Sequence, residues 1–255
     1  MKSNLSLLSY FLKKDIKTKY AGSGLGMLWT VLMPLLQVLL FWLVFSQIMK
    51  ARPYAHTEIP YLYFMLSSFF FWLAFSEGLL RASSAIVENA EMVKKISFPN
   101  IVLPVTVTLS SYLHHFVGFL IFILIYFFTT SFKPMVVMVV PILFLQVVFS
   151  LGMGMLFSAL LTYLRDIGQI MGPLMQGMFF LSPVIYSIES VPERLRFLFY
   201  FNPMTYFASS YHRIILLNEA PPLVYLAVIL LLSCGSLAAG LHVFRKLRDG
   251  FADVL

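Results

Sequence analysis

Ionisable side chains are scarce in this chain, and the single carboxylate within an expected membrane segment has a basic partner nearby. Of all residues, 60% are hydrophobic and 11% are charged, whereas an ordinary soluble domain has about 25% charged residues. Glu77 and Arg81 stand four positions apart, in the order that favours an ion pair on one face of a helix. An ionisable residue in a membrane segment is a functional candidate. Its position near the segment's end, with a partner at hand, favours a structural ion pair.

Two adjacent histidines, His114 and His115, are the other candidates for chemistry inside an apolar segment. Neighbouring side chains point about 100° apart around a helix, so this pair does not readily chelate one metal ion. No carboxylate or cysteine is near them in the sequence, and the single cysteine, Cys234, belongs to another apolar segment. We therefore expect no metal and no cofactor bound by this chain, although one of the histidines remains a candidate to face a channel.

Phosphate chemistry is also missing from the sequence. The three glycines Gly22, Gly24 and Gly26 form a flexible turn, but no Gly-Lys-Ser/Thr motif follows it. A Gly-Lys pair occurs nowhere in the chain, which excludes an ATPase of the P-loop type. The net charge of +7 comes from basic residues in short loops beside apolar segments. That arrangement is typical of membrane orientation, so we expect no nucleic-acid partner.

Six apolar segments organise these residues into one all-α integral membrane domain covering residues 1–255. A helix needs about 20 apolar residues to cross a bilayer, and we expect crossings at 28–48, 61–80, 101–128, 136–163, 167–188 and 223–244. Gly152 and Gly154 permit a close helix contact in the fourth. Gly168 and Gly172 form a GxxxG pattern in the fifth, which is a weak signal alone.

Two amphipathic segments lie outside the expected crossings. Residues 1–20 predict a helix on the membrane surface, with an apolar face and lysines to the other side: Leu5, Leu8, Leu12 and Ile16 against Lys13, Lys14 and Lys17. Residues 84–98 predict a short helix in which Glu91 pairs with Lys95. A solvated loop would fit the composition of this second segment equally well.

The stretch 163–203 is the most unusual part of the chain. It opens with Arg165-Asp166, continues as the fifth apolar segment, and ends at Asn202-Pro203 after a piece too short to cross. Such a piece can enter the membrane only if its backbone is buried in protein or lines a cavity. We therefore expect 191–217 to form a re-entrant outer gate, with a polar side made of Arg194, Arg196, His212 and Arg213.

The distribution of lysine and arginine predicts orientation. Six crossings place both termini on one side, and that side holds 12 of the 18 Lys and Arg residues. The richer side is the cytoplasm. Residues 245–255 are then expected to be a cytoplasmic tail.

Three patches of sequence carry a resemblance to a known family. They are KYAGSGLGMLW at 19–29 with Pro34-Leu35; Asn89-Ala90 through Lys94-Lys95 to Phe98-Pro99 with Leu103-Pro104; and Arg165-Asp166-Ile167 through FLSPVIY at 180–186 to Asn202-Pro203. Together they resemble the membrane subunits of ABC-2 type exporters, and specifically the Wzm, KpsM and TarG group that exports lipid-linked O antigen, capsule and teichoic acid. The resemblance implies a permease, with no enzymatic activity, in the bacterial inner membrane.

The same resemblance implies partners. It implies a homodimer with two copies of a separate P-loop ATPase that binds ATP and magnesium, in contact with membrane lipids and carrying a lipid-linked polysaccharide. The resemblance also assigns roles to three sets of residues. The expected ATPase contact consists of Glu88, Glu91, Lys94, Lys95, Arg165 and Asp166, and the expected substrate entrance consists of Lys19, Tyr20, Gly24, Leu25, Gly26 and Trp29. The expected outer gate consists of Pro183, Tyr186, Arg194, Arg196, Asn202 and Pro203.

Two other functions stay open from sequence. An ABC-2 exporter of a small hydrophobic drug or lipid would show the same patches. A stand-alone channel or proton-coupled carrier would need ionisable groups near the midplane, and Glu77 is the best candidate for one.

Overall fold

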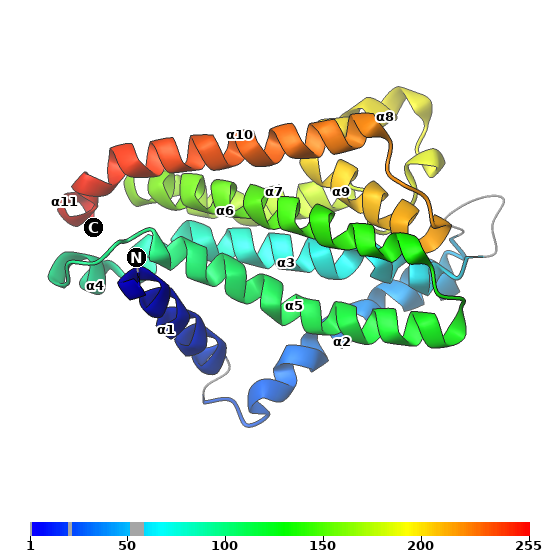
Figure 1. Cartoon of the computed structure of the whole chain (residues 1–255), viewed down its shortest axis with the longest axis horizontal. Coiled ribbons are helices and arrows are strands. Elements are labelled where there is room, and N and C mark those ends of the chain that lie inside the picture. Colours follow the sequence, from blue (N-terminus) through cyan, green and yellow to red (C-terminus); the bar gives the residue numbers. More distant parts are fainter. Residues whose placement is uncertain (1, 20–21, 52–58) are drawn as a thin grey trace.

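The computed structural model describes residues 2–19, 22–51 and 59–255. In this part of the chain every regular element is a helix. The helices form an elongated bundle, and both termini lie at one end of it (Figure 1). The expected fold class, an all-α membrane protein, is confirmed.

Five helical segments among the described residues are long and apolar enough to cross a membrane. They are α2 with its π-helical end (Trp29–Phe41 and Trp42–Ile48), α3 (Tyr61–Glu88), α5 (Val102–Thr129), α6 (Val139–Tyr163, after the short helix Pro134–Met138) and α10 (Leu223–Leu247). These match five of the six expected crossings, because unbroken apolar length decides where a membrane helix forms.

The second crossing continues further than predicted. We expected a helix over 61–80 and a separate one over 84–98, but α3 continues to Glu88 and only the six-residue α4 (Ala90–Lys95) follows. The buried Ala82, Ala85 and Ile86 extend the packed face of α3. The helix ends where the side chain of Asn89 donates a hydrogen bond to the Ala85 carbonyl, 2.8 Å away.

The expected fifth crossing over 167–188 is shorter than predicted. Helix α7 (Asp166–Phe180) has 15 residues and is about 22 Å long at 1.5 Å per residue, which is less than the ~30 Å hydrocarbon core. The stretch 191–217, where we expected gate helices, contains α8 (Glu193–Tyr200), α9 (Pro203–His212) and the π-helical turn Arg213–Leu217. Asn202 caps α9 and Pro203 opens it, a pairing that starts a new helix.

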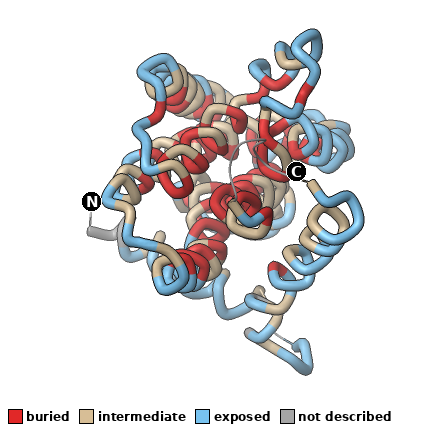
Figure 2. The backbone as a smooth tube through the Cα atoms, turned by 90° about the vertical axis from the view of Figure 1, so that its right-hand side faces the viewer, coloured by how far each residue is buried: buried red, intermediate tan, exposed pale blue. Residues whose placement is uncertain are grey.

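Helix α3 is the centre of the bundle. In the most apolar 18-residue stretch of α3, 67% of the residues are buried, whereas in the corresponding stretch of α2 only 6% are buried. Figure 2 shows the buried residues gathered in the middle of the bundle, seen along its long axis. Aromatic rings fill this centre, including Phe64, Phe75 and Tyr211. Helix α2 is thus attached to the core by one side only.

The predicted close contact at Gly152 and Gly154 is confirmed. A Cβ atom on Gly240 of α10 would lie 2.1 Å from the Gly152 carbonyl oxygen, and one on Gly154 would lie 2.9 Å from the Ala82 Cβ. The GxxxG pair behaves differently, because nothing lies within 4 Å of a Cβ built on Gly172.

Both ends of the chain pack at one end of the bundle. Helix α1 (Lys2–Thr18) lies against α5; Leu8 and Leu12 are half-buried, Ile16 is exposed, and the side chain of Leu5 lies outside the described part. Residues 245–255 are not a loose tail: α10 continues to Leu247 and the short α11 (Phe251–Val254) buries Phe251 completely. Phe251 packs against Phe244 and Tyr163, with ring centroids 5.4 and 6.2 Å apart.

Candidate functional site

A groove opens between α2, α3 and α7. Its aromatic wall is made of Phe41, Phe69, Trp72 and Phe179. The Phe179 ring joins the three helices, because its centroid lies 5.3 Å from Phe41, 5.5 Å from Trp72 and 6.4 Å from Phe69.

Polar side chains line the other parts of the groove. Gln37 of α2 and Gln176 of α7 are both exposed, and Ser76 of α3, which also lines the groove, is half-buried. Polar groups in membrane helices face a cavity or another helix, because lipid offers them no hydrogen bonds. Aromatic faces beside amide groups match the apolar faces and hydroxyls of a sugar chain. The groove is therefore our candidate substrate path.

Asn202 attaches α9 to the end of this groove. Its amide donates hydrogen bonds to the carbonyls of Met178, at 2.7 Å, and Leu181, at 3.0 Å. Its side-chain oxygen accepts from the Met204 amide at 3.0 Å. One buried side chain thus joins the end of α7 to the start of α9, so α9 and the groove wall are mechanically connected.

Helix α9 is also fixed to the core. Gln146 of α6 is fully buried; it donates to the Phe71 carbonyl at 3.0 Å and accepts from the Tyr211 hydroxyl at 2.6 Å. His212, which we predicted on a polar outer side, is buried and bonds Ser68 of α3 at 2.9 Å. That prediction was wrong because α9 returns through the bundle, so its side chains need partners inside it.

The other predicted gate residues include both buried and solvent-exposed side chains. Pro183 is buried, and the half-buried Tyr186 donates a hydrogen bond from its hydroxyl to the Phe180 carbonyl. Arg196 donates to the carbonyls of Val191, at 2.9 Å, and Glu189, at 3.1 Å, and so closes the turn before α8. Arg194 is exposed.

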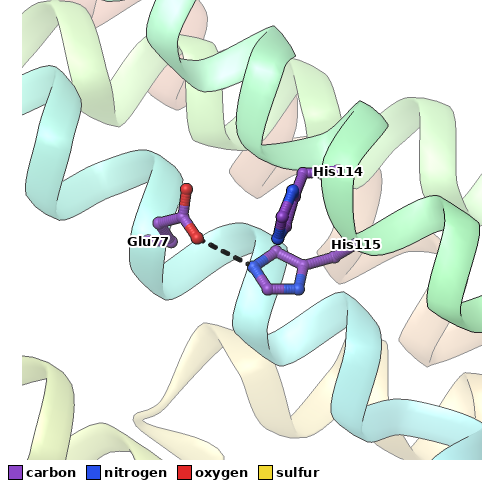
Figure 3. A group of neighbouring side chains, drawn as sticks. All are labelled: Glu77, His114 and His115. Carbon is purple, nitrogen blue, oxygen red and sulfur yellow. Dashed lines mark hydrogen bonds and ion pairs between the residues drawn. The ribbon is translucent and has the colours of Figure 1, made fainter. Parts of the chain in front are cut away.

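Glu77 forms a larger network than the predicted pair. Its Oε1 lies 3.4 Å from Arg81 Nη1, as expected, but also 2.6 Å from Lys19 Nζ and 3.0 Å from the Ser111 hydroxyl. Its Oε2 bonds His115 Nε2 at 3.0 Å. Three elements, the end of α1, α3 and α5, meet at this one carboxylate (Figure 3 shows the α3 and α5 parts).

The sequence showed no carboxylate near the two histidines, and the fold corrects this. Ligand atoms of Glu77, His114 and His115 all lie within 4.8 Å of one another, as the three side chains in Figure 3 show. The carboxylate already bonds two cations, Lys19 and Arg81. These positive charges oppose a divalent ion at the same oxygens, so the geometry favours an ion-pair network over a metal centre.

The residues assigned to the substrate entrance lie on and beside the connection between α1 and α2. Lys19 is paired with Glu77 and is 16% exposed. Trp29 donates from its indole nitrogen to the Ser23 hydroxyl at 2.8 Å, while Gly24 and Leu25 are exposed and Gly26 has a φ of +48°. Tyr20 lies outside the described residues.

The model of the ABC-2 type transporter family matches residues 6–216, which include most of α1, the groove, α8 and α9. The chain belongs to the ABC-2 type transporter family. It is thus a transport subunit that crosses the membrane several times.

Curated relatives of this ABC-2 chain cover its full length. Two are O-antigen export system permease proteins RfbA of Klebsiella pneumoniae, 28% and 27% identical over 263 aligned positions, covering 100% of this chain and 98% of the relative. A third is the protein of the same name from Myxococcus xanthus, 29% identical over 255 positions, covering 97% of this chain and 94% of the relative.

The residues predicted to contact an ATPase lie at the end of the helical bundle where both chain termini are found. Glu91 and Lys95 of α4 form the predicted ion pair, 2.5 Å apart and both largely exposed, and Lys94 is exposed. Glu88 belongs to the last turn of α3, where its Oε1 accepts from Ser84 at 2.6 Å. Arg165 and Asp166 are exposed at the short turn between α6 and α7.

Three important residues escaped the sequence analysis. Gln37 and Gln176 stand inside apolar segments, so a scan for polar residues in such segments would have flagged them. The same scan would have flagged Gln146. What no scan gives is that two of these amides face a groove while the third is buried against Tyr211.

Proposed function

We propose that this chain is the permease subunit of an ATP-driven exporter that moves a lipid-linked polysaccharide, best matched to O antigen, out across the bacterial inner membrane. The observation that carries the proposal is the groove between α2, α3 and α7, where exposed amides of Gln37 and Gln176 stand beside the rings of Trp72 and Phe179. The names of the full-length relatives support the substrate class.

A second copy of the chain completes the path. The groove is open on one side, and both helices that flank the opening are poorly covered: α2 has few buried residues, and Gly172 and Gly177 of α7 have open space where a Cβ would lie. A homodimer that places two such grooves face to face would enclose a channel. Family membership supports a partner ATPase, and we propose two copies of it, which bind the ATP and magnesium.

The end that holds both termini is the cytoplasmic end in this proposal. It presents α1, α4 and the α6–α7 turn together (Figure 1), and these are the surfaces on which the ATPases would act. Movement of the α6–α7 turn would pass directly into α7, which forms one wall of the groove. Asn202 would carry that movement to the re-entrant helices.

Substitution of the groove amides tests the proposal. A strain that lacks the gene is complemented with Gln37→Leu, Gln176→Leu and the double variant, and its surface polysaccharide is quantified by gel and by specific antibody. We expect the amount of surface polysaccharide to fall at least tenfold in the double variant, while its membranes keep normal amounts of the transporter and normal ATPase activity. Gln47→Leu is the matched control, because Gln47 is exposed on the π-helical end of α2 and does not line the groove.

Normal surface polysaccharide in the double variant would contradict the assignment of the groove. Normal polysaccharide in the strain without the gene, together with a new sensitivity to hydrophobic drugs, would contradict the substrate class and indicate a small-molecule exporter. Export that continues after depletion of ATP would contradict ATP-driven transport altogether.

A further inference from the structure

A second cleft lies on the other side of α2, between α2, α3 and α5. Helix α2 contributes Val31, Pro34, Leu35 and Val38, which fall on one helical face by their spacing. Helix α5 contributes residues from His114 to Ile125, a length of about 16 Å at 1.5 Å per residue. Leu66 and Phe70 of α3 form its floor.

This cleft differs chemically from the groove on the opposite side of α2. The groove carries two amides and a hydroxyl, whereas the polar side chains among the described residues that line the cleft are His114 and His115, both at one end. The floor is tight there, because a Cβ on Gly118 would lie 2.4 Å from the Phe70 ring. The cleft is therefore long, narrow and apolar, with one polar end.

The polar end lies beside the basic N-terminal segment. His115 bonds Glu77, and Glu77 bonds Lys19, so the end of α1 reaches this point. Residues 1–28 contain five lysines and one aspartate, and Lys13, Lys14 and Lys17 are exposed. Lys19 and Arg81 balance Glu77 and Asp15, with which they form ion pairs, so the excess positive charge comes from Lys13, Lys14 and Lys17. The surroundings of the polar end are thus net positive and attract an anionic headgroup.

The depth of the cleft suits a lipid. Helix α5 has 28 residues, about eight more than a crossing requires. With its Thr129 end at one membrane surface, about 20 residues of the helix cross the hydrocarbon core, and the other surface lies near Ser110. His114 then lies about one helical turn, ~6 Å, inside that surface, and the apolar part of the cleft extends from it further into the core.

We propose that this cleft holds one acyl chain of an anionic phospholipid, with the headgroup against the lysines of α1 and the chain between α2 and α5. The bound chain supplies packing that α2 lacks. It also supports the helix that forms a wall of the groove.

Native mass spectrometry of the full-length protein, purified in mild detergent with its associated subunits, tests the site. The probes are dioleoyl phosphatidylglycerol and dioleoyl phosphatidylcholine, titrated separately. We expect one phosphatidylglycerol per chain, bound at least tenfold more tightly than phosphatidylcholine. Ile121→Trp, which fills the cleft, should weaken phosphatidylglycerol binding at least tenfold. Leu124→Trp is the matched control on the same helix, exposed but outside the cleft, and should leave binding unchanged.

The headgroup and the occupant are tested separately. Lys14→Gln with Lys17→Gln should reduce the preference for phosphatidylglycerol at least threefold. Equal binding of both lipids to the unmodified protein, or unchanged binding by Ile121→Trp, would overturn the proposal. So would an Ile121→Cys cross-link between two copies in a Cys234→Ser background, because it would place protein, not lipid, over the cleft.

Discussion

Lys19 Nζ lies 2.6 Å from Glu77 Oε1, and this ion pair fixes the end of α1 to the middle of α3. A second pair, Arg81 Nη2 to Asp15 Oδ1 at 2.5 Å, runs between the same two helices in the opposite sense of charge. Two ion pairs at separate points along α1 define both the distance between α1 and α3 and the angle between their axes. Helix α1 is therefore held in one orientation against the bundle, as our proposal that it transmits motion from an ATPase requires.

Glu77→Gln should destabilise the transporter. The substitution keeps the shape of the side chain but leaves Lys19, 16% exposed, without its carboxylate, and breaking a buried ion pair costs about 3 kcal/mol. We expect a clearly lower thermal midpoint for the purified protein in detergent, measured by tryptophan fluorescence. Lys19→Met combined with Glu77→Gln should cost less than the two single changes added together. Strict additivity would show that the pair is not coupled.

A surface ion pair provides the comparison for Glu77. Glu91→Gln removes the charge from the Glu91–Lys95 pair, in which both side chains are over 70% exposed. Such pairs contribute about 0–1 kcal/mol, so the thermal midpoint should hardly change. If this residue contacts the ATPase as we propose, the variant should instead lower export or ATPase stimulation.

Asn202→Ala should uncouple the re-entrant helices from α7. The change removes two hydrogen bonds to α7 and its following turn, together with the cap of α9, a loss of about 2–3 kcal/mol. We expect faster cleavage by protease between α7 and α9 and a strong loss of export. Asn202→Asp keeps the cap but cannot donate to the two carbonyls, and it should also fail. Arg194→Ala, at an exposed position, should export normally.

Gly240→Ala should force α6 and α10 apart. The added Cβ would lie 2.1 Å from the Gly152 carbonyl oxygen, a backbone atom that cannot move independently of its helix, and overpacking of this kind costs about 1–3 kcal/mol. Gly235→Ala lies on the same helix with nothing within 4 Å of the new Cβ, so it should be neutral or slightly stabilising. Equal thermal midpoints for the two variants would contradict the contact.

Phe251→Ala should loosen the end of the bundle that carries α4. The ring is fully buried among Phe244, Tyr163 and the helices they belong to, and loss of a buried phenylalanine costs about 3–5 kcal/mol. Hydrogen exchange should increase in α4 and α11 first. Val254→Ala, at a partly exposed position of the same short helix, is the control and should leave exchange unchanged.

The sequence predicted the helices whose ends coincide with the ends of apolar runs. Helices α5, α6 and α10 begin and end within about three residues of prediction, since membrane helices follow unbroken apolar length. The errors fall where tertiary packing decides the boundary. Helix α3 continues past its apolar run because Ala85 and Ile86 are buried against other helices, and α11 folds because Phe251 finds a pocket among residues far away in the sequence.

What the sequence determined by itself was the class of protein, through its apolar segments, the missing P-loop, and the three patches now matched by the family over residues 6–216. The tertiary structure alone decided which polar residues act together. Glu77 meets Lys19, 58 positions away, and His115, 38 positions away, while Asn202 meets Met178 across a reversal of the chain. Local spacing constrains neighbours on one helix, but contacts between helices depend on how whole faces pack, and that information is distributed over the entire chain.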